Sequence, residues 1–260
     1  MSAATRARLA RMLAGEAIDL AEANLLIAAE GSPGLDADSA LAHVEGLAQL
    51  ARGAGVVPTL RDQGFRGDAD DYDDPRNSFL NEVLERRRGL PIALATLTLA
   101  VAGRVGAPMA GIGMPGHFLV ADLAGAEPAY LDPFDGWSAV SREDCALIVR
   151  RTSGLEMRPE FLAPVTERAI LVRTLANLRG SYLRRRRLAD ALWTVELGLM
   201  LTPDDPLLAS QSVVLLAGTG RYDEAEAQAT ARLESRPGDA AAATLEAQLE
   251  AVRDMRRRMN

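Results

Sequence analysis

The stretch that decides the fold runs from Asn77 to Phe134 and contains Asn77-Ser-Phe-Leu-Asn81-Glu82, Arg86-Arg-Arg-Gly89-Leu-Pro91, Pro115-Gly-His117-Phe-Leu-Val and Tyr130-Leu-Asp132-Pro-Phe134. Between the second and third of these motifs lies the apolar run Ile92-Ala-Leu-Ala-Thr-Leu-Thr-Leu-Ala-Val-Ala102. Its Ala and Leu content favours helix, and its all-round apolar character predicts that the helix is buried. Proline suits the first position of a helix, so we expect Pro91 to open it and Gly106 to close it.

Three short apolar segments follow this helix, at residues 109–114, 117–122 and 129–132. A Pro-Gly break separates the first two, and their length and composition are typical of strands. A buried helix followed by neighbouring short strands predicts an α+β core, with His117 on one strand and Asp132 on another.

The order of these motifs resembles that of the transglutaminase/papain-like superfamily, in which Gly-x-Cys begins a buried helix and a His and an Asp follow. Gly89-x-Pro91 stands here at the Gly-x-Cys position, and Gly106-x-Pro108, His117 and Asp132 come after it in order. In finer detail the residue pattern of these motifs is similar to that of the SirB-type family of bacterial transglutaminase-like proteins with C-terminal tetratricopeptide (TPR)-like repeats. This resemblance implies a helical N-terminal lead-in, a core made of a buried helix and a small antiparallel sheet, and C-terminal helical repeats.

Pro91 is the main departure from the catalytic relatives. Their helix-start Cys is the nucleophile, its thiolate is favoured by the helix N-terminus and a nearby His, and its backbone N–H helps to stabilise the oxyanion. Proline has neither the thiol nor the N–H, and the SirB-type pattern itself carries Pro at this position. The resemblance therefore excludes Cys-dependent transglutaminase or peptidase chemistry at Pro91.

The polar residues around Pro91 allow two interpretations each. His117 and Asp132 are either a general base oriented by a carboxylate or a hydrogen-bonded pair kept for structure. Asn81, Glu82 and Arg88 either bind a carboxylate or amide of a ligand beside Pro91, or tie the incoming helix to the core through buried hydrogen bonds.

Composition narrows the class of protein. The 260 residues are 48% hydrophobic with a net charge of −7, which argues against a general nucleic-acid binder. Every one of the 29 basic residues is Arg. The single Cys145 fits a reducing cytoplasm and a small buried thiol. No signal peptide, membrane span or cofactor motif is expected from the sequence.

Metal binding is not expected either. The acidic segment 67–75 lacks the Gly and the closing Glu of a calcium loop, so it is interpreted as a solvated loop leading into the next helix. His43 has no ligand partner one helical turn away and is interpreted as a half-exposed helix residue.

The C-terminal part shows a repeat. The helix stops Pro203 and Pro237 are separated by the 34-residue TPR period, and Leu188-x-x-Ala191 recurs at the same offset as Tyr222-x-x-Ala225. We expect helices near 166–183, 188–201, 206–217, 222–233 and 240–259. The Arg run 184–187 between the first two is either a solvated turn or a site for an acidic partner. The expected division is a transglutaminase-like domain at 1–160, with its core at about 60–140, and a repeat region at 161–260.

Two functions of different class follow. The first is a protein-binding or regulatory module that engages a protein or peptide through the TPR-like region or a cleft near His117. The second is an enzyme that uses the His117–Asp132 dyad without a covalent Cys intermediate, such as a hydrolase acting on peptide or amide bonds.

Overall fold

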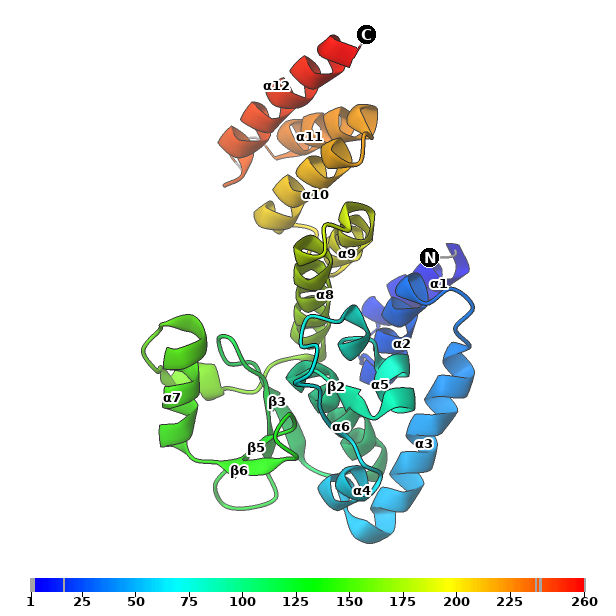
Figure 1. The fold of residues 1–260 in the computed structure, drawn as a ribbon, viewed down its shortest axis with the longest axis vertical. Helices are drawn as coiled ribbons and strands as arrows, with labels where there is room; N and C mark the ends of the chain where they lie inside the picture. Colours follow the sequence, from blue (N-terminus) through cyan, green and yellow to red (C-terminus); the bar gives the residue numbers. More distant parts are fainter. Residues whose placement is uncertain (1–2, 16, 237, 239, 260) are drawn as a thin grey trace. The chain divides into compact units, whose positions relative to one another are not determined.

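The computed structural model describes residues 3–15, 17–236, 238 and 240–259, and it confirms the α+β class, with mostly helices and one small antiparallel sheet (Figure 1). The chain forms two compact units, Met1–Thr174 and Leu175–Asn260. The elements of the first unit are α1 (Ala3–Leu13), α2 (Leu20–Gly31), α3 (Ala37–Ala54), α4 (Val56–Asp62), β1 (Arg66–Gly67), η1 (Pro75–Asn77), α5 (Leu80–Arg86), β2 (Arg88–Gly89), α6 (Pro91–Val105), β3 (Met109–Ile112), β4 (Leu119–Asp122), β5 (Ala129–Asp132), β6 (Ser138–Val140), α7 (Arg142–Ser153) and η2 (Pro159–Leu162). Helix α8 (Glu167–Arg184) begins in this unit and continues into the second, where α9 (Leu188–Leu201), α10 (Pro206–Gly218), α11 (Tyr222–Ser235) and α12 (Ala242–Met259) follow.

Helix α6 is the centre of the first unit. Pro91 occupies its first turn, and Gly106 ends it in the left-handed conformation with a φ of 70°. The helix packs against α2, α3, α4 and α5 and against strands β3 and β4. Its Leu94, Leu97 and Val101 are each 0% exposed. The prediction that Pro91 begins a buried helix is therefore confirmed.

The sheet has the order β3-β4-β5-β6, and every neighbouring pair is antiparallel. Its buried face packs partly on Cys145 and Val149 of α7. One expectation was wrong in detail, because His117 lies two residues before β4 and not within it. The reason is the Pro115–Gly116 turn, where Gly116 adopts a φ of +73°, so the chain becomes extended only after His117. Strand β6 was not expected.

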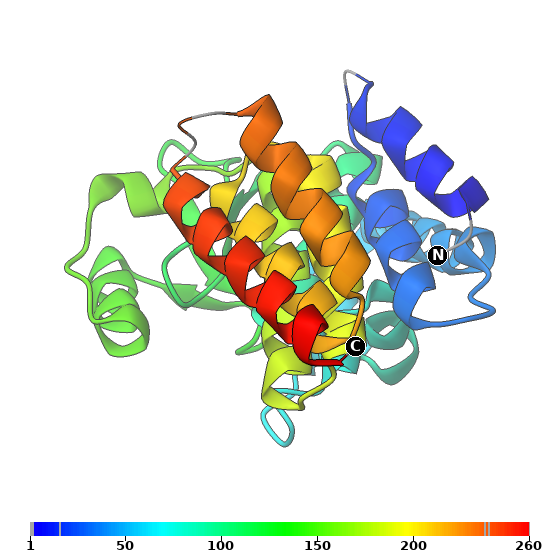
Figure 2. The same ribbon diagram turned by 90° about the horizontal axis from the view of Figure 1, so that it is seen from above.

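The helices of the second unit repeat a local pattern. Helix α11 begins and ends 34 residues after α9, and the turns before both helices have a left-handed residue at the same offset, Arg186 with φ 56° and Gly220 with φ 79°. Helix α10 packs against α9 and α11, and α11 packs against α12, so that α10, α11 and α12 lie side by side in Figure 2. Pro237, the second expected helix stop, lies outside the described residues. Within the described part of the chain, no helix combines the length and apolar character needed to cross a membrane.

Candidate functional site

His117 and Asp132 form a hydrogen-bonded pair. The His117 Nε2 lies 2.8 Å from Asp132 Oδ2, which confirms the expected contact, and the two side chains are 15% and 13% exposed. The other carboxylate oxygen, Oδ1, accepts the backbone N–H of Phe134 at 2.9 Å. Asp132 therefore holds the imidazole by Nε2, and Nδ1 is the ring nitrogen that the carboxylate does not engage.

The turn that carries His117 is fixed by a residue that sequence analysis missed. Arg173 of α8 donates from its two terminal nitrogens to the carbonyls of Met114 and His117, each at 2.7 Å, and its guanidinium stands 5.4 Å from the centre of the Phe118 ring. Burial lowers the pKa of this guanidinium. The signal in the sequence was its place among Ile170, Leu171 and Thr174, since a cation on a buried helix face needs internal acceptors.

The start of α6 is joined to the Asp132 segment through the short strands β1 and β2. Leu90 N–H donates to the Asn77 carbonyl at 2.8 Å, and Gly67 N–H donates to the Phe134 carbonyl at 3.2 Å. A Cβ on Gly67 would stand 2.5 Å from that same carbonyl oxygen, so only glycine allows this approach. Because β1 pairs with β2 directly before Pro91, the fold brings Pro91 and Asp132 into one neighbourhood.

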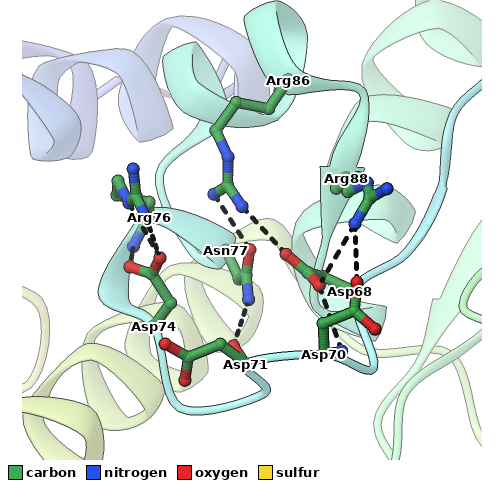
Figure 3. A network of polar contacts seen from close by, with 8 residues as sticks. All are labelled: Asp68, Asp70, Asp71, Asp74, Arg76, Asn77, Arg86 and Arg88. Carbon is green, nitrogen blue, oxygen red and sulfur yellow. Dashed lines mark hydrogen bonds and ion pairs between the residues drawn. The ribbon is translucent and has the colours of Figure 1, made fainter.

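The expectation of a solvated loop holds for Asp70 and Asp71, which are exposed, but it is wrong for the two ends of the acidic segment, where Asp68 and Asp74 are buried. Asp68 is only 4% exposed and forms an ion pair of 2.9 Å with Arg86 (Figure 3). Arg86 also donates to Asn77 Oδ1 at 3.1 Å, and Asn77 Nδ2 donates to the Asp71 carbonyl at 2.8 Å. Arg86 therefore neutralises the buried carboxylate of Asp68 and holds this segment to the end of α5.

Arg88, in the same run of arginines as Arg86, pairs with Asp70 at 2.9 Å, and this pair is more exposed (Figure 3). Arg88 therefore lies beside the start of α6, where its sequence position suggested, and it ties the acidic segment to β2.

Tyr72 is a second residue that sequence analysis missed. Its ring is 48% exposed and packs edge-on against Phe134 with 5.8 Å between ring centres. Its position inside a run of aspartates gave no signal beyond an acidic segment.

Two of the expected binding residues, Asn81 and Glu82, do not lie with the His117–Asp132 pair. Asn81 lines an open cavity of about 580 Å³ together with His43 and Arg87, and the residues that line this cavity do not include His117 or Asp132. Glu82, on the next position of α5, interacts electrostatically with Arg76. Asn81 is therefore not part of the dyad's surroundings.

Cys145 offers no replacement nucleophile. It is 0% exposed in the first turn of α7, behind the capping box formed by Ser141 and Asp144. Burial raises the pKa of its thiol to about 11. Within the part of the chain that the structure describes, no cluster of His, Cys, Asp and Glu could hold a metal ion.

The arrangement therefore holds the His117 ring by one nitrogen beside a carboxylate, with the Phe134 ring two residues from that carboxylate. Neither Pro91 nor Cys145 supplies a thiolate, so a covalent acyl intermediate on sulfur cannot form at either residue.

Comparison with known proteins shows which family the chain is similar to. Residues 45–176 match the family model of the transglutaminase-like superfamily. The chain is 34% identical over 209 residues to a UPF0162 protein of Xylella fastidiosa, covering 74% of each chain. It is 37% identical over 145 residues to a UPF0162 protein of Vibrio cholerae, covering 55% of this chain and 54% of that one.

A shorter similarity reaches beyond bacteria. Human F-box only protein 21 is 41% identical over 71 residues, which is 27% of this chain and 11% of the human protein. No solved structure matches the chain.

Proposed function

This chain belongs to the transglutaminase-like superfamily, and we propose that it is a protein-binding or regulatory module and not a Cys-dependent transglutaminase or peptidase. The observation that supports this role best is the buried Pro91 in the first turn of α6, where acyl transfer needs a thiol and an N–H. The fully buried Cys145 supports it further. In this role the His117–Asp132 pair fastens the turn before β4 to the end of β5.

The C-terminal helices are, in this proposal, a short TPR-like scaffold of the SirB type. The equal 34-residue spacing of α9 and α11 supports it. So does a repeated ion pair at the helix starts, since Arg187 binds Asp190 and Arg221 binds Glu224 at the same offset. Ala191 and Ala225, both 0% exposed, are the small residues that allow close helix packing at matching positions. The single buried thiol and the lack of any other cysteine support a cytoplasmic setting.

The test is affinity capture from an extract of the source cells with quantitative mass spectrometry. The full chain is compared with a chain that ends after Arg184, which keeps all of α8 and hence the contacts of Arg173. We expect specific proteins on the full chain that are lost or depleted on the shortened one. A full chain that enriches no protein above a blank resin contradicts the binding role.

A second candidate function is hydrolysis of a peptide or amide bond by activated water. The intact 2.8 Å contact supports it, because a carboxylate on Nε2 leaves Nδ1 to accept a proton. Turnover of a peptide-amide library by the wild-type chain, abolished by His117→Ala at unchanged melting temperature, would establish this function in place of the first.

A further inference from the structure

The turn that joins α8 to α9 consists of four consecutive arginines, residues 184–187 (Figure 1). The equivalent turn of the next helix pair, 34 residues later, reads Gly218-Thr-Gly-Arg221. The last arginine is common to both turns and has a structural task in each, since it forms an ion pair with an acidic residue three positions later. The other three arginines, residues 184–186, occur in the first turn alone, and we call them the arginine turn.

The two turns have the same backbone. In the first, the N–H groups of residues 187 and 186 donate to the carbonyls of residues 182 and 183, at 2.9 and 3.0 Å. The second turn repeats both hydrogen bonds at the same distances, 34 residues later. Because Gly, Thr and Gly form this turn equally well, its geometry does not require the arginine turn.

Arg186 stands at the position where the second turn has a glycine. Its φ is 56°, and that of Gly220 is 79°. Helices commonly end in a left-handed residue of this kind, and only glycine adopts the conformation without steric cost. The arginine is therefore less favourable for the fold than a glycine would be. Residues held in such unfavourable conformations are concentrated at sites of function.

The electrostatics of the helix end do not explain the arginine turn either. Basic residues interact favourably with the C-terminus of a helix, yet the last turn of α10, all of which the structure describes, contains no basic residue. The side chains of residues 184–186 are all exposed. They place three positive charges side by side on the surface of a chain whose net charge is −7.

We propose that the arginine turn is an interaction surface for an acidic segment of a protein partner, whose carboxylates it binds. A guanidinium matches a carboxylate in shape, because it can donate two parallel N–H bonds to the two oxygens. Nucleic acid fits less well, because a chain with a net charge of −7 repels an extended polyanion. The inference rests on the proposed protein-binding role and names the chemistry of the partner.

The test is an NMR titration of the ¹⁵N-labelled full chain at low salt with the capped peptide acetyl-Gly-Glu-Gly-Glu-Gly-Glu-amide. The same peptide with Gln in place of Glu is titrated beside it. We expect saturable shifts of the backbone amides of residues 183–188 with the Glu peptide and none with the Gln peptide. Added salt should weaken the binding, because exposed ion pairs are screened.

The decisive variant copies the second turn into the first through Arg184→Gly, Arg185→Thr and Arg186→Gly, and we call it the turn-copy variant. It should weaken binding of the Glu peptide about tenfold, because it removes three exposed cations. Arg186→Gly alone should weaken binding about twofold and melt at the wild-type temperature or above it, because it relieves a left-handed arginine.

The matched control removes the same number of positive charges elsewhere in the second unit. Arg256→Gln, Arg257→Gln and Arg258→Gln act together in the last turn of α12, where Arg256 already pairs with Asp223 at 2.9 Å. This control variant should bind the Glu peptide as tightly as the wild type.

Three outcomes overturn the proposal. They are a titration without saturable shifts, binding by the turn-copy variant as tight as that of the wild type, and equal weakening in the turn-copy and control variants. A short oligothymidylate that binds at the arginine turn while the Glu peptide does not would also overturn it, because the ligand would then be a nucleic acid.

The proposed protein-binding role is tested apart from this surface by the capture experiment. Proteins captured equally by the wild-type chain and by the turn-copy variant would preserve the role and reject the arginine turn as its surface. Saturable binding of the Glu peptide that the turn-copy variant loses, without any captured protein, would keep the surface and reject the role.

Discussion

The stability of the His117–Asp132 dyad depends on the hydrogen bonds of the Asp132 carboxylate. His117 is hydrogen-bonded to Asp132 Oδ2, and the Phe134 N–H donates to Oδ1. The Asp132 side chain is only 13% exposed. His117→Ala leaves one of these oxygens without its partner, so we expect a loss of about 1–3 kcal/mol in the free energy of unfolding. Urea denaturation measures it, and His43→Ala, at an exposed position, should change stability by less than about 0.5 kcal/mol.

The Cys145 thiol should be unreactive in the folded protein. Its pKa is raised to about 11 by burial, so almost no thiolate exists at pH 8, and the sulfur has no access to reagents. We expect iodoacetamide at pH 8 to label the chain only after denaturation, as read by intact mass. Cys145→Ser should leave any measured turnover unchanged. Labelling of the native protein within minutes would contradict both the burial and the absence of a thiol nucleophile.

At the scale of elements, Arg86 and Arg88 hold the segment from Asp68 to Asn77 through ion pairs of different burial. Arg86→Ala leaves the carboxylate of Asp68, 4% exposed, without its 2.9 Å partner and should cost about 3 kcal/mol. Arg88→Ala removes a 2.9 Å pair with Asp70, which is 84% exposed, and only a longer 4.0 Å contact with Asp68, so its cost should stay at about 1 kcal/mol or less. Equal losses in urea denaturation would mean that the Asp68 pair is not the anchor.

The two equivalent turns of the second unit form a natural pair for a stability test. Arg186 and Gly220 are both left-handed, and only glycine adopts this conformation without steric cost. Arg186→Gly should therefore stabilise the protein by about 0.5 kcal/mol, and Gly220→Ala should destabilise it by about 1 kcal/mol. Thermal unfolding of the two variants checks the opposite signs. A loss in Arg186→Gly would mean that the arginine makes a contact worth more than the strain.

The elements that local sequence controls could be predicted, and those fixed by distant partners could not. Helix α6 followed from Pro91, Gly106 and an apolar run, and α9 and α11 followed from a period within the chain itself. The burial of Asp68 depends on Arg86, which lies in another element, and a run of aspartates looks the same whether or not a cation meets it.

The candidate site shows the same limit. The dyad could be predicted because His117 lies just before one strand and Asp132 ends the next, and the order of these motifs along the chain is recognisable. Arg173 was not visible, because its role depends on two carbonyls of the turn before β4, and backbone acceptors leave no mark in a sequence.

At the scale of the whole molecule, the α+β class and the order of helices, sheet and C-terminal helices followed from the chain. The cavity at Asn81 did not, because it exists only where the start of α3 meets α5, and residues 36–43 and 81–87 carry no shared motif. A structure was needed to separate Asn81 from His117, since both belong to the densest stretch of motifs.

The two tryptophans fall one in each compact unit, and this gives the protein a built-in fluorescence report on the order of folding. Trp137 is buried beside α6, where its indole N–H donates to Thr98 Oγ1 at 3.0 Å, and Trp193 packs on Tyr182 in the helices of the second unit. Contacts between successive helices close short loops and form fast, whereas Trp137 needs partners distant in sequence. In stopped-flow refolding, the Trp137→Phe variant should recover its remaining emission earlier than the Trp193→Phe variant does. One shared rate constant would mean that both units cross a single barrier together.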